Sequence, residues 1–77
     1  MSLIEAYPEK KLKIVEIRSG HEARRKLNAI GLHIDDYVIK INNPRHGPIL
    51  LKSAFRDSQV LAIGHQLAEK IIVEYEQ

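Results

Sequence analysis

Four histidines are the residues of this chain best suited to hold a transition metal, because a neutral imidazole nitrogen is a common ligand of such ions. The closest grouping of a histidine with carboxylates is His33 with Asp35 or Asp36. A tight site needs three or four converging ligands, and the other histidines lie on separate segments without H-x-x-x-H or H-x-x-E spacing. Those three are His21, His46 and His65. The sequence therefore predicts no specific metal site, and solvent-exposed histidines are the simpler interpretation.

The sequence also lacks a recognisable catalytic constellation. Serine, histidine and aspartate all occur, but at no spacing typical of a nucleophile elbow, a phosphate-binding glycine loop or a pair of catalytic carboxylates. A domain of 77 residues has little room for a substrate cleft. We therefore expect a protein without enzymatic activity and without a cofactor.

A basic run, Arg24-Arg25-Lys26, lies on a predicted helix, and Arg24 and Arg25 fall outside the apolar stripe of that helix. Such a run is usually just a solvated helix face. The alternative is that it docks on an acidic protein surface. Binding of nucleic acid is not expected, since the net charge is only +2 and aromatic residues that could stack on bases are few.

Three successive apolar residues, Ile49 to Leu51, place at least one side chain on the face of a strand that points away from the core. We assign Leu50 to that outer side, together with Val38 on the preceding strand. Lys40 and Lys52 then form a positive rim around this apolar pair. An apolar centre with a charged rim is typical of a modest protein-binding site. The alternative is that the N-terminal segment or the last strand covers this patch.

The chain has 77 residues, no cysteine and a formal net charge of +2. This length corresponds to one domain, and we treat residues 1–77 as a single unit. The lack of cysteine excludes disulfides and thiolate metal sites, and it suits a reducing compartment. No apolar run approaches the ~20 residues of a membrane-spanning helix, and the N-terminal segment has no secretory signal. These features predict a cytoplasmic protein that does not insert into membranes.

The elements that must position these residues begin with a strand at 12–17 and a helix directly after it. Ser19 and Glu22 have capping-box spacing at the start of the helix. Its apolar stripe repeats every three or four residues, at Ala23, Leu27 and Ile30. Gly31 can take the left-handed conformation that ends the helix, so that Leu32 folds back onto it in a Schellman motif.

Further strands are indicated by alternation and length at 37–41, 49–53, 59–63 and 71–75, with a turn at 56–58 and a helical turn around Leu67 and Ala68. In the first strand, Leu12 and Ile14 share one face while Val15 and Ile17 share the other. That pattern requires either cover on both faces or a bulge.

The stretch 42–48 is rich in turn-forming residues and makes the strands on either side of it a β-hairpin. Pairing that is symmetric about this loop places Ile39 opposite Leu51 on the inner side. It places Val38 opposite Lys52 on the outer side.

The order of small, apolar and glycine positions from Gly47 to Val73 resembles the FeoA family, which ends in a short strand, a helical turn around a Leu-Ala pair and a last Ile-x-Val strand. Earlier in the chain, Leu27, Gly31 and Leu32 look like the Leu-x-x-x-Gly-Leu core of that family. Leu3 and Pro8 look like its opening. Two positions depart from the family pattern, because Glu9 and Asp35 stand where glycines are common.

The resemblance implies a mainly β fold: a small SH3-like barrel of about five strands, with one helix inserted after the first strand and a short helical turn before the last. It also implies a cytoplasmic accessory protein of ferrous iron uptake that binds the cytoplasmic part of the FeoB permease as a non-catalytic docking module. We predict six partner-binding residues: Arg24, Arg25, Val38, Lys40, Leu50 and Lys52.

The alternative function is a metal-sensing or regulatory module, because similar SH3-like domains are attached to iron-dependent transcription repressors. This chain shows no helix-turn-helix of its own, so such a module would need a separate DNA-binding partner. A weak homodimer also stays open.

Overall fold

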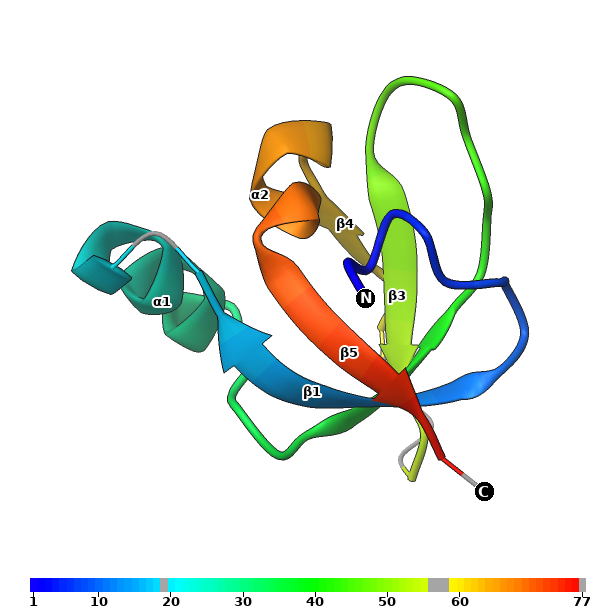
Figure 1. The fold of residues 1–77 in the computed structure, drawn as a ribbon, viewed down its shortest axis with the longest axis horizontal. Helices are drawn as coiled ribbons and strands as arrows, with labels where there is room; N and C mark the ends of the chain where they lie inside the picture. The colour runs from blue at the N-terminus through cyan, green and yellow to red at the C-terminus, as the bar shows by residue number, and fades with distance from the viewer. Residues whose placement is uncertain (19, 56–58, 77) are drawn as a thin grey trace.

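The computed structural model describes residues 1–18, 20–55 and 59–76 of the chain. Five strands form one antiparallel sheet in the order β4-β3-β2-β1-β5: β1 (Lys11–Ile17), β2 (Tyr37–Lys40), β3 (Ile49–Ser53), β4 (Leu61–Ile63) and β5 (Ile71–Tyr75). Helix α1 (Gly20–Ala29) follows β1, and the short helix α2 (His65–Glu69) precedes β5 (Figure 1). The predicted architecture of five strands, an inserted helix and a late helical turn is therefore confirmed.

Strand β1 bends because of a bulge in its middle. Leu12 and Ile14 are buried, and the pairing of β1 with β5 then shifts between Ile14 and Glu16. The extra residue returns Ile17 to the buried side. The bulge is the correct one of the two alternatives that the sequence left open, and it lets one strand pair with both β2 and β5.

The end of α1 has the predicted Schellman geometry. The N–H of Leu32 donates to the carbonyl oxygen of Leu27 at 2.9 Å, and the N–H of Gly31 donates to that of Asn28 at 3.0 Å. Gly31 has a φ of 94°, which a glycine adopts without strain. Because the chain turns here, Ile30 falls beyond the last helical residue and is 43% exposed instead of buried.

The structure also shows the backbone at the two positions where glycine is common in the family, and the start of β4. Glu9 and Asp35 both take positive φ values, 67° and 77°, so the chain keeps at both places a conformation that suits glycine. Strand β4 begins at Leu61, two residues later than predicted. The predicted capping serine, Ser19, and the predicted turn at 56–58 lie outside the described residues.

The β2–β3 hairpin pairs one residue away from the predicted register. Lys40 lies opposite Leu51, and Ile39 lies opposite Lys52. Val38 and Lys40 are therefore on the inner side, with exposed fractions of 2% and 0%. Our assignment of both residues to the outer side is wrong, because a slip of one residue exchanges the two faces of a strand.

A side-chain clamp in the hairpin loop explains this register. The Oδ1 atom of Asn42 accepts the N–H of Leu50 at 2.9 Å, and its Nδ2 atom donates to the carbonyl oxygen of Pro48 at 3.1 Å. The N–H of Ile41 then donates to the carbonyl oxygen of Leu50. The loop thus closes asymmetrically, whereas we had assumed symmetric pairing.

Lys40 fastens the N-terminal segment onto the sheet. Its Nζ atom donates to the carbonyl oxygens of Ile4 at 2.9 Å and Ala6 at 2.8 Å, and to Oδ1 of Asn43 at 3.2 Å. Among the described residues, no carboxylate pairs with this ammonium group. Burial lowers the pKa of Lys40 below its ordinary value of 10.5, because desolvation disfavours the charged form.

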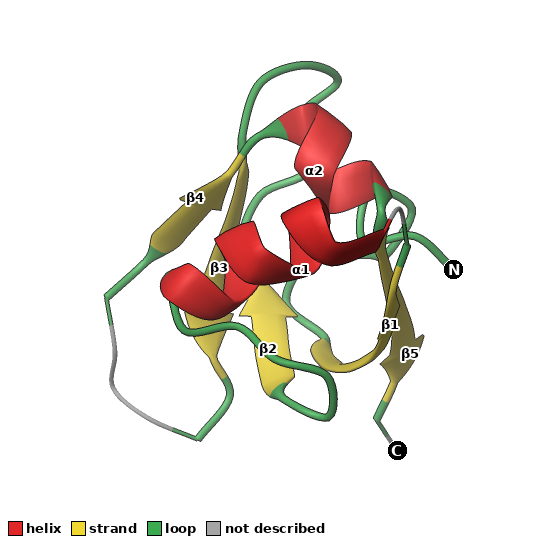
Figure 2. Cartoon of the chain, turned by 90° about the vertical axis from the view of Figure 1, so that its left-hand side faces the viewer, coloured by secondary structure: helices red, strands yellow, loops and turns green. Residues whose placement is uncertain are grey.

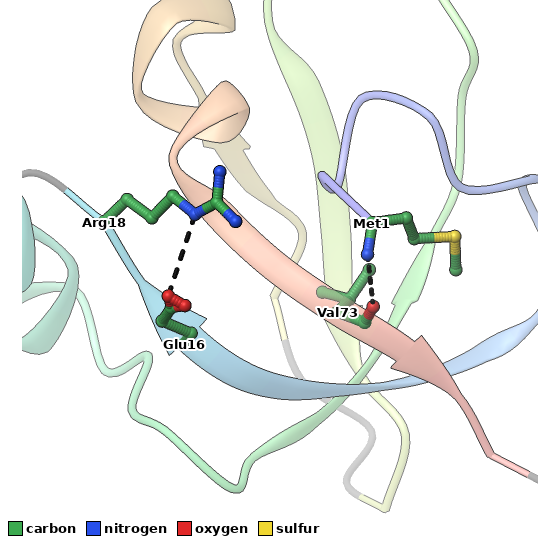
Figure 3. A network of polar contacts seen from close by, with 4 residues as sticks. All are labelled: Met1, Glu16, Arg18 and Val73. Atoms are coloured by element: carbon green, nitrogen blue, oxygen red, sulfur yellow. Dashed lines mark hydrogen bonds and ion pairs between the residues drawn. The ribbon is translucent and has the colours of Figure 1, made fainter.

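The N-terminal segment also covers the outer edge of β5. Ser2 bridges to Ile72, and the N–H of Val73 donates to the carbonyl oxygen of Met1 at 2.8 Å. Figure 3 shows the amino group of Met1 directed at the carbonyl oxygen of Val73, 3.4 Å away. The same view shows Arg18 and Glu16 at the end of β1, an exposed ion pair of 3.7 Å that contributes little to stability.

A single apolar core joins all of these elements. Its fully buried aliphatic side chains come from the N-terminal segment, from α1 and from every strand: Leu3, Leu12, Ile14, Leu27, Val38, Ile49, Leu51, Ile63, Ile71 and Val73. Neither helix of the described chain has the length and apolar character that crossing a bilayer requires.

Candidate interaction surfaces

The side of the sheet that points away from the core carries a mixed apolar and basic surface. Across β1, β2 and β3, Lys11 lies opposite Ile39, and Ile39 lies opposite Lys52. Partners on adjacent strands point to the same side, so these three side chains form one row. Lys13 and Tyr37 form the next pair, and Leu50 lies two residues before Lys52. We call these six residues the outer face: Lys11, Lys13, Tyr37, Ile39, Leu50 and Lys52.

One end of the outer face is an aromatic pair with a lysine against it. The rings of Tyr37 and Phe55 meet edge to face, with centroids 5.3 Å apart and an interplanar angle of 75°. The Nζ atom of Lys11 lies 4.1 Å from the Phe55 centroid and 5.2 Å from that of Tyr37. Each cation–π contact at an exposed site contributes about 0.5–1 kcal/mol, so Lys11 favours this position of the Phe55 ring, which is 67% exposed.

Two of the predicted partner-binding residues lie on the outer face, and two do not. Leu50 is half-buried and Lys52 is exposed, both on the outer side of β3. Val38 and Lys40 lie on the inner side of the sheet and take no part in the outer face. Their places at the surface are taken by residues that the sequence reasoning missed: Lys11, Lys13, Tyr37, Ile39 and Phe55. The alternation Lys-Leu-Lys-Ile at 11–14 was the signal that could have placed two of these lysines on one face.

Arg24 and Arg25, the other two predicted residues, belong to a different surface. Both are exposed on α1. This helix buries Leu27 in the same core cluster as Val38, on the inner side of the sheet. Figure 2 shows α1 lying across the strands on that side. The structure therefore does not bring Arg24 and Arg25 together with Leu50 and Lys52.

His33, the histidine with nearby carboxylates, is engaged in a local turn. Its Nδ1 atom lies 3.6 Å from Oδ2 of Asp36, and the same oxygen accepts the backbone N–H of His33 at 2.8 Å. Asp35 instead pairs with Lys13 at 3.7 Å. Within the part of the chain that the structure describes, no three metal-ligating side chains converge. The metal-sensing alternative thus has no supporting observation among these residues.

Comparison with known proteins identifies relatives across the whole fold. The family model of the FeoA domain matches residues 1–75. A crystal structure of an iron uptake regulatory protein, FeoA, is 30% identical, with a TM-score of 0.85 over 99% of this chain and 97% of its own. No curated protein matches.

Two structures from clostridia show the same fold at lower identity. Iron(II) transport protein A from Clostridium thermocellum is 22% identical, with a TM-score of 0.80 over 97% of this chain and 45% of its own. An FeoA-like protein from Clostridium acetobutylicum is 24% identical, with a TM-score of 0.79 over 97% of this chain and 85% of its own. These two likenesses support the predicted SH3-like fold, and the family model together with the 30% identical FeoA structure confirms the family resemblance.

Proposed function

Because this chain belongs to the FeoA family and so has a role in ferrous iron transport, we propose that it is a non-catalytic accessory protein that docks on the cytoplasmic part of the FeoB permease. The docking surface is the outer face. The observation that carries this proposal is the joining of half-buried apolar side chains, Ile39 and Leu50, with lysines on either side. A partner that covers them removes apolar area from water while the lysines stay at the rim.

The lysine rim sets the kind of partner surface that fits. Lys11, Lys13 and Lys52 all come from the outer side of the sheet, so they favour an acidic surface on the permease. Charges at the rim of an interface mainly steer the encounter and fix the orientation, whereas the apolar centre supplies most of the affinity. Docking of this kind biases the assembly or the conformation of the permease and requires no chemistry in this chain. A cytoplasmic location is part of the same proposal.

An amide-resolved NMR titration with the soluble cytoplasmic domain of the same organism's ferrous permease tests the proposal. We expect saturable shifts at residues 11–13, 37–41 and 50–52, and not along α1. Shifts along the exposed side of α1 would instead move the contact to Arg24 and Arg25. The absence of shifts anywhere on the outer face at saturating permease domain contradicts the proposed docking surface.

A variant sharpens this experiment. Leu50→Asp places a charge in the apolar centre, and we expect it to weaken binding about tenfold. Val60→Asp is the matched control, since Val60 is an apolar residue that is 53% exposed and lies outside the outer face. Equal losses for the two variants would show that added negative charge alone, and not the outer face, controls binding.

A further inference from the structure

A groove lies on another part of the molecule, where the C-terminal end of α1 approaches the ends of β3 and β4. It has a volume of about 480 Å³. Its lining includes Leu32 and Val38, which are buried in the core, and the half-buried Leu61. Because core residues line it, the groove is already formed in the free protein. A volume of this size admits several side chains of a bound segment.

Two large apolar side chains in the lining are exposed to water. Ile30 is 43% exposed because the Schellman turn takes it out of the core stripe of α1. Phe55 is 67% exposed and is held by its contacts with Tyr37 and Lys11. Exposed side chains of this size beside an apolar floor are typical of a surface that a partner covers.

The charge of the groove is opposite to that of the outer face. Asp35 and Asp36 are both in its lining, and their side chains are 77% and 40% exposed. Among the residues that the structure describes, Lys13 is the one ion-pair partner of Asp35, at the long distance of 3.7 Å, and most of the Asp35 side chain faces water. No lysine or arginine is among the described residues that line the groove. In a chain with a pI near 9.0, this is a local acidic site next to an apolar floor.

We propose that this groove binds a segment of a partner protein that carries an apolar side chain next to a lysine or arginine. The apolar side chain lies between Ile30 and Phe55, above Leu32 and Val38. The basic group pairs with Asp35 and Asp36, which favour it over an acidic one. This binding does not depend on the proposed docking on the permease: apart from Tyr37, which borders both surfaces, it uses residues outside the outer face and has the opposite charge preference.

Three matched synthetic heptapeptides test the proposal on the full chain. Their central residues are Leu-Lys-Leu, Leu-Glu-Leu or Ser-Lys-Ser, with the same uncharged flanks. In amide-resolved NMR titrations we expect the Leu-Lys-Leu peptide to give saturable shifts at residues 30–38, 53–55 and 59–61. The Leu-Glu-Leu and Ser-Lys-Ser peptides should each bind at least about fivefold more weakly. The first lacks the cation, and the second lacks the apolar side chains.

Two variants of the protein separate the apolar and the charged contributions. Ile30→Ser changes an exposed side chain, so the fold is retained while affinity for the Leu-Lys-Leu peptide falls about fivefold. Asp35→Asn keeps a residue type that tolerates the left-handed conformation at φ 77°. In this variant the preference for Leu-Lys-Leu over Leu-Glu-Leu shrinks.

Three results would overturn the proposal. One is the absence of groove shifts at millimolar peptide. Another is equal affinity of the unchanged protein for the Leu-Lys-Leu and Leu-Glu-Leu peptides. The third is a set of shifts in the groove that grow with protein concentration without any peptide, which would assign the groove to a second copy of this chain. None of these results bears on the outer face, which the permease-domain titration tests alone.

Discussion

The outer face and the groove both present apolar side chains, but they surround them with opposite charges. Three lysines border the outer face, whereas two aspartates lie in the groove. The two surfaces meet at Tyr37 and Phe55, and the Lys13–Asp35 ion pair of 3.7 Å crosses their boundary. A chain with a net charge of only +2 can thus present two partners with distinct surfaces. The sign of the rim, more than the apolar area, then selects which partner binds.

The two surfaces also differ in how the chain builds them. The outer face follows from the alternation of side chains along three hydrogen-bonded strands, so its geometry depends on register. The groove depends on where a helix stops and how the chain turns, at Gly31 with a φ of 94° and at Asp35 with a φ of 77°. A one-residue slip of β2 would replace Tyr37 and Ile39 on the outer face by Val38 and Lys40. It would change only part of the groove.

The largest expected effect tests that register. Lys40→Ala removes the donor to Ile4, Ala6 and Asn43 and leaves a cavity, so we expect it to lower the free energy of unfolding by about 2–4 kcal/mol. Lys52→Ala, on the exposed side of the same hairpin, should change it by less than about 0.5 kcal/mol. Urea denaturation of both variants measures the difference. Small and equal losses of unfolding free energy in the two variants would indicate that Lys40 is exposed on the outer side, and the outer face as described would then be wrong.

Lys40 also shows where reasoning from the sequence stops. A lysine on an alternating strand is ordinarily placed in water, because burying an ammonium group is costly. Here backbone carbonyls of the N-terminal segment offset part of that cost, and the residues that supply them are more than thirty positions away. No local sequence pattern predicts that these distant carbonyl groups will accept hydrogen bonds from Lys40. The register error has a similar origin, since it depends on the side chain of Asn42 in the loop.

Local signals, by contrast, predicted well the parts of the fold that local chemistry decides. The Schellman turn at Gly31, just after α1, was predicted from the glycine and the leucine that follows it, and the bulge after Ile14 was one of the two alternatives that the spacing of apolar residues left open. Only two of the six residues of the outer face, Leu50 and Lys52, were predicted. The groove was not predicted at all, because its floor joins Leu32, Val38 and Leu61 from three distant segments. Ile30 is exposed, although the sequence analysis placed it in the apolar stripe of the helix. The spacing of Ala23, Leu27 and Ile30 does not indicate that the helix ends at Ala29.

A smaller effect tests whether the two surfaces are independent. Lys52→Glu reverses one rim charge of the outer face, and we expect it to weaken binding of the permease domain about fivefold. It should leave the affinity for the Leu-Lys-Leu peptide unchanged within about twofold, because Lys52 is not among the residues lining the groove. Asp35→Asn should weaken binding of the Leu-Lys-Leu peptide and leave the affinity for the permease domain nearly unchanged. Fluorescence anisotropy with both ligands gives the four affinities, and parallel losses would mean that one continuous surface binds both.

The smallest effect concerns pH and the inner side of the hairpin. Because burial lowers the pKa of Lys40 in the folded protein, the folded state releases its proton at a lower pH than the unfolded chain, where the pKa is near 10.5. Below both values each state is protonated, and the cost of burying the ammonium is fully present. Between them the unfolded chain binds more protons, so the free energy of unfolding rises with pH.

Other groups titrate in the same range, so the measurement needs a reference. Lys40→Met keeps an unbranched side chain in the core but has no proton to release. We expect the difference in unfolding free energy, Lys40 protein minus Lys40→Met variant, to rise as pH increases from neutral towards 10.5. Urea denaturation at a series of pH values measures it. A difference that falls with pH would mean that the three oxygens around Nζ favour the ammonium more than burial disfavours it, so that this site stabilises the charge more strongly than water does.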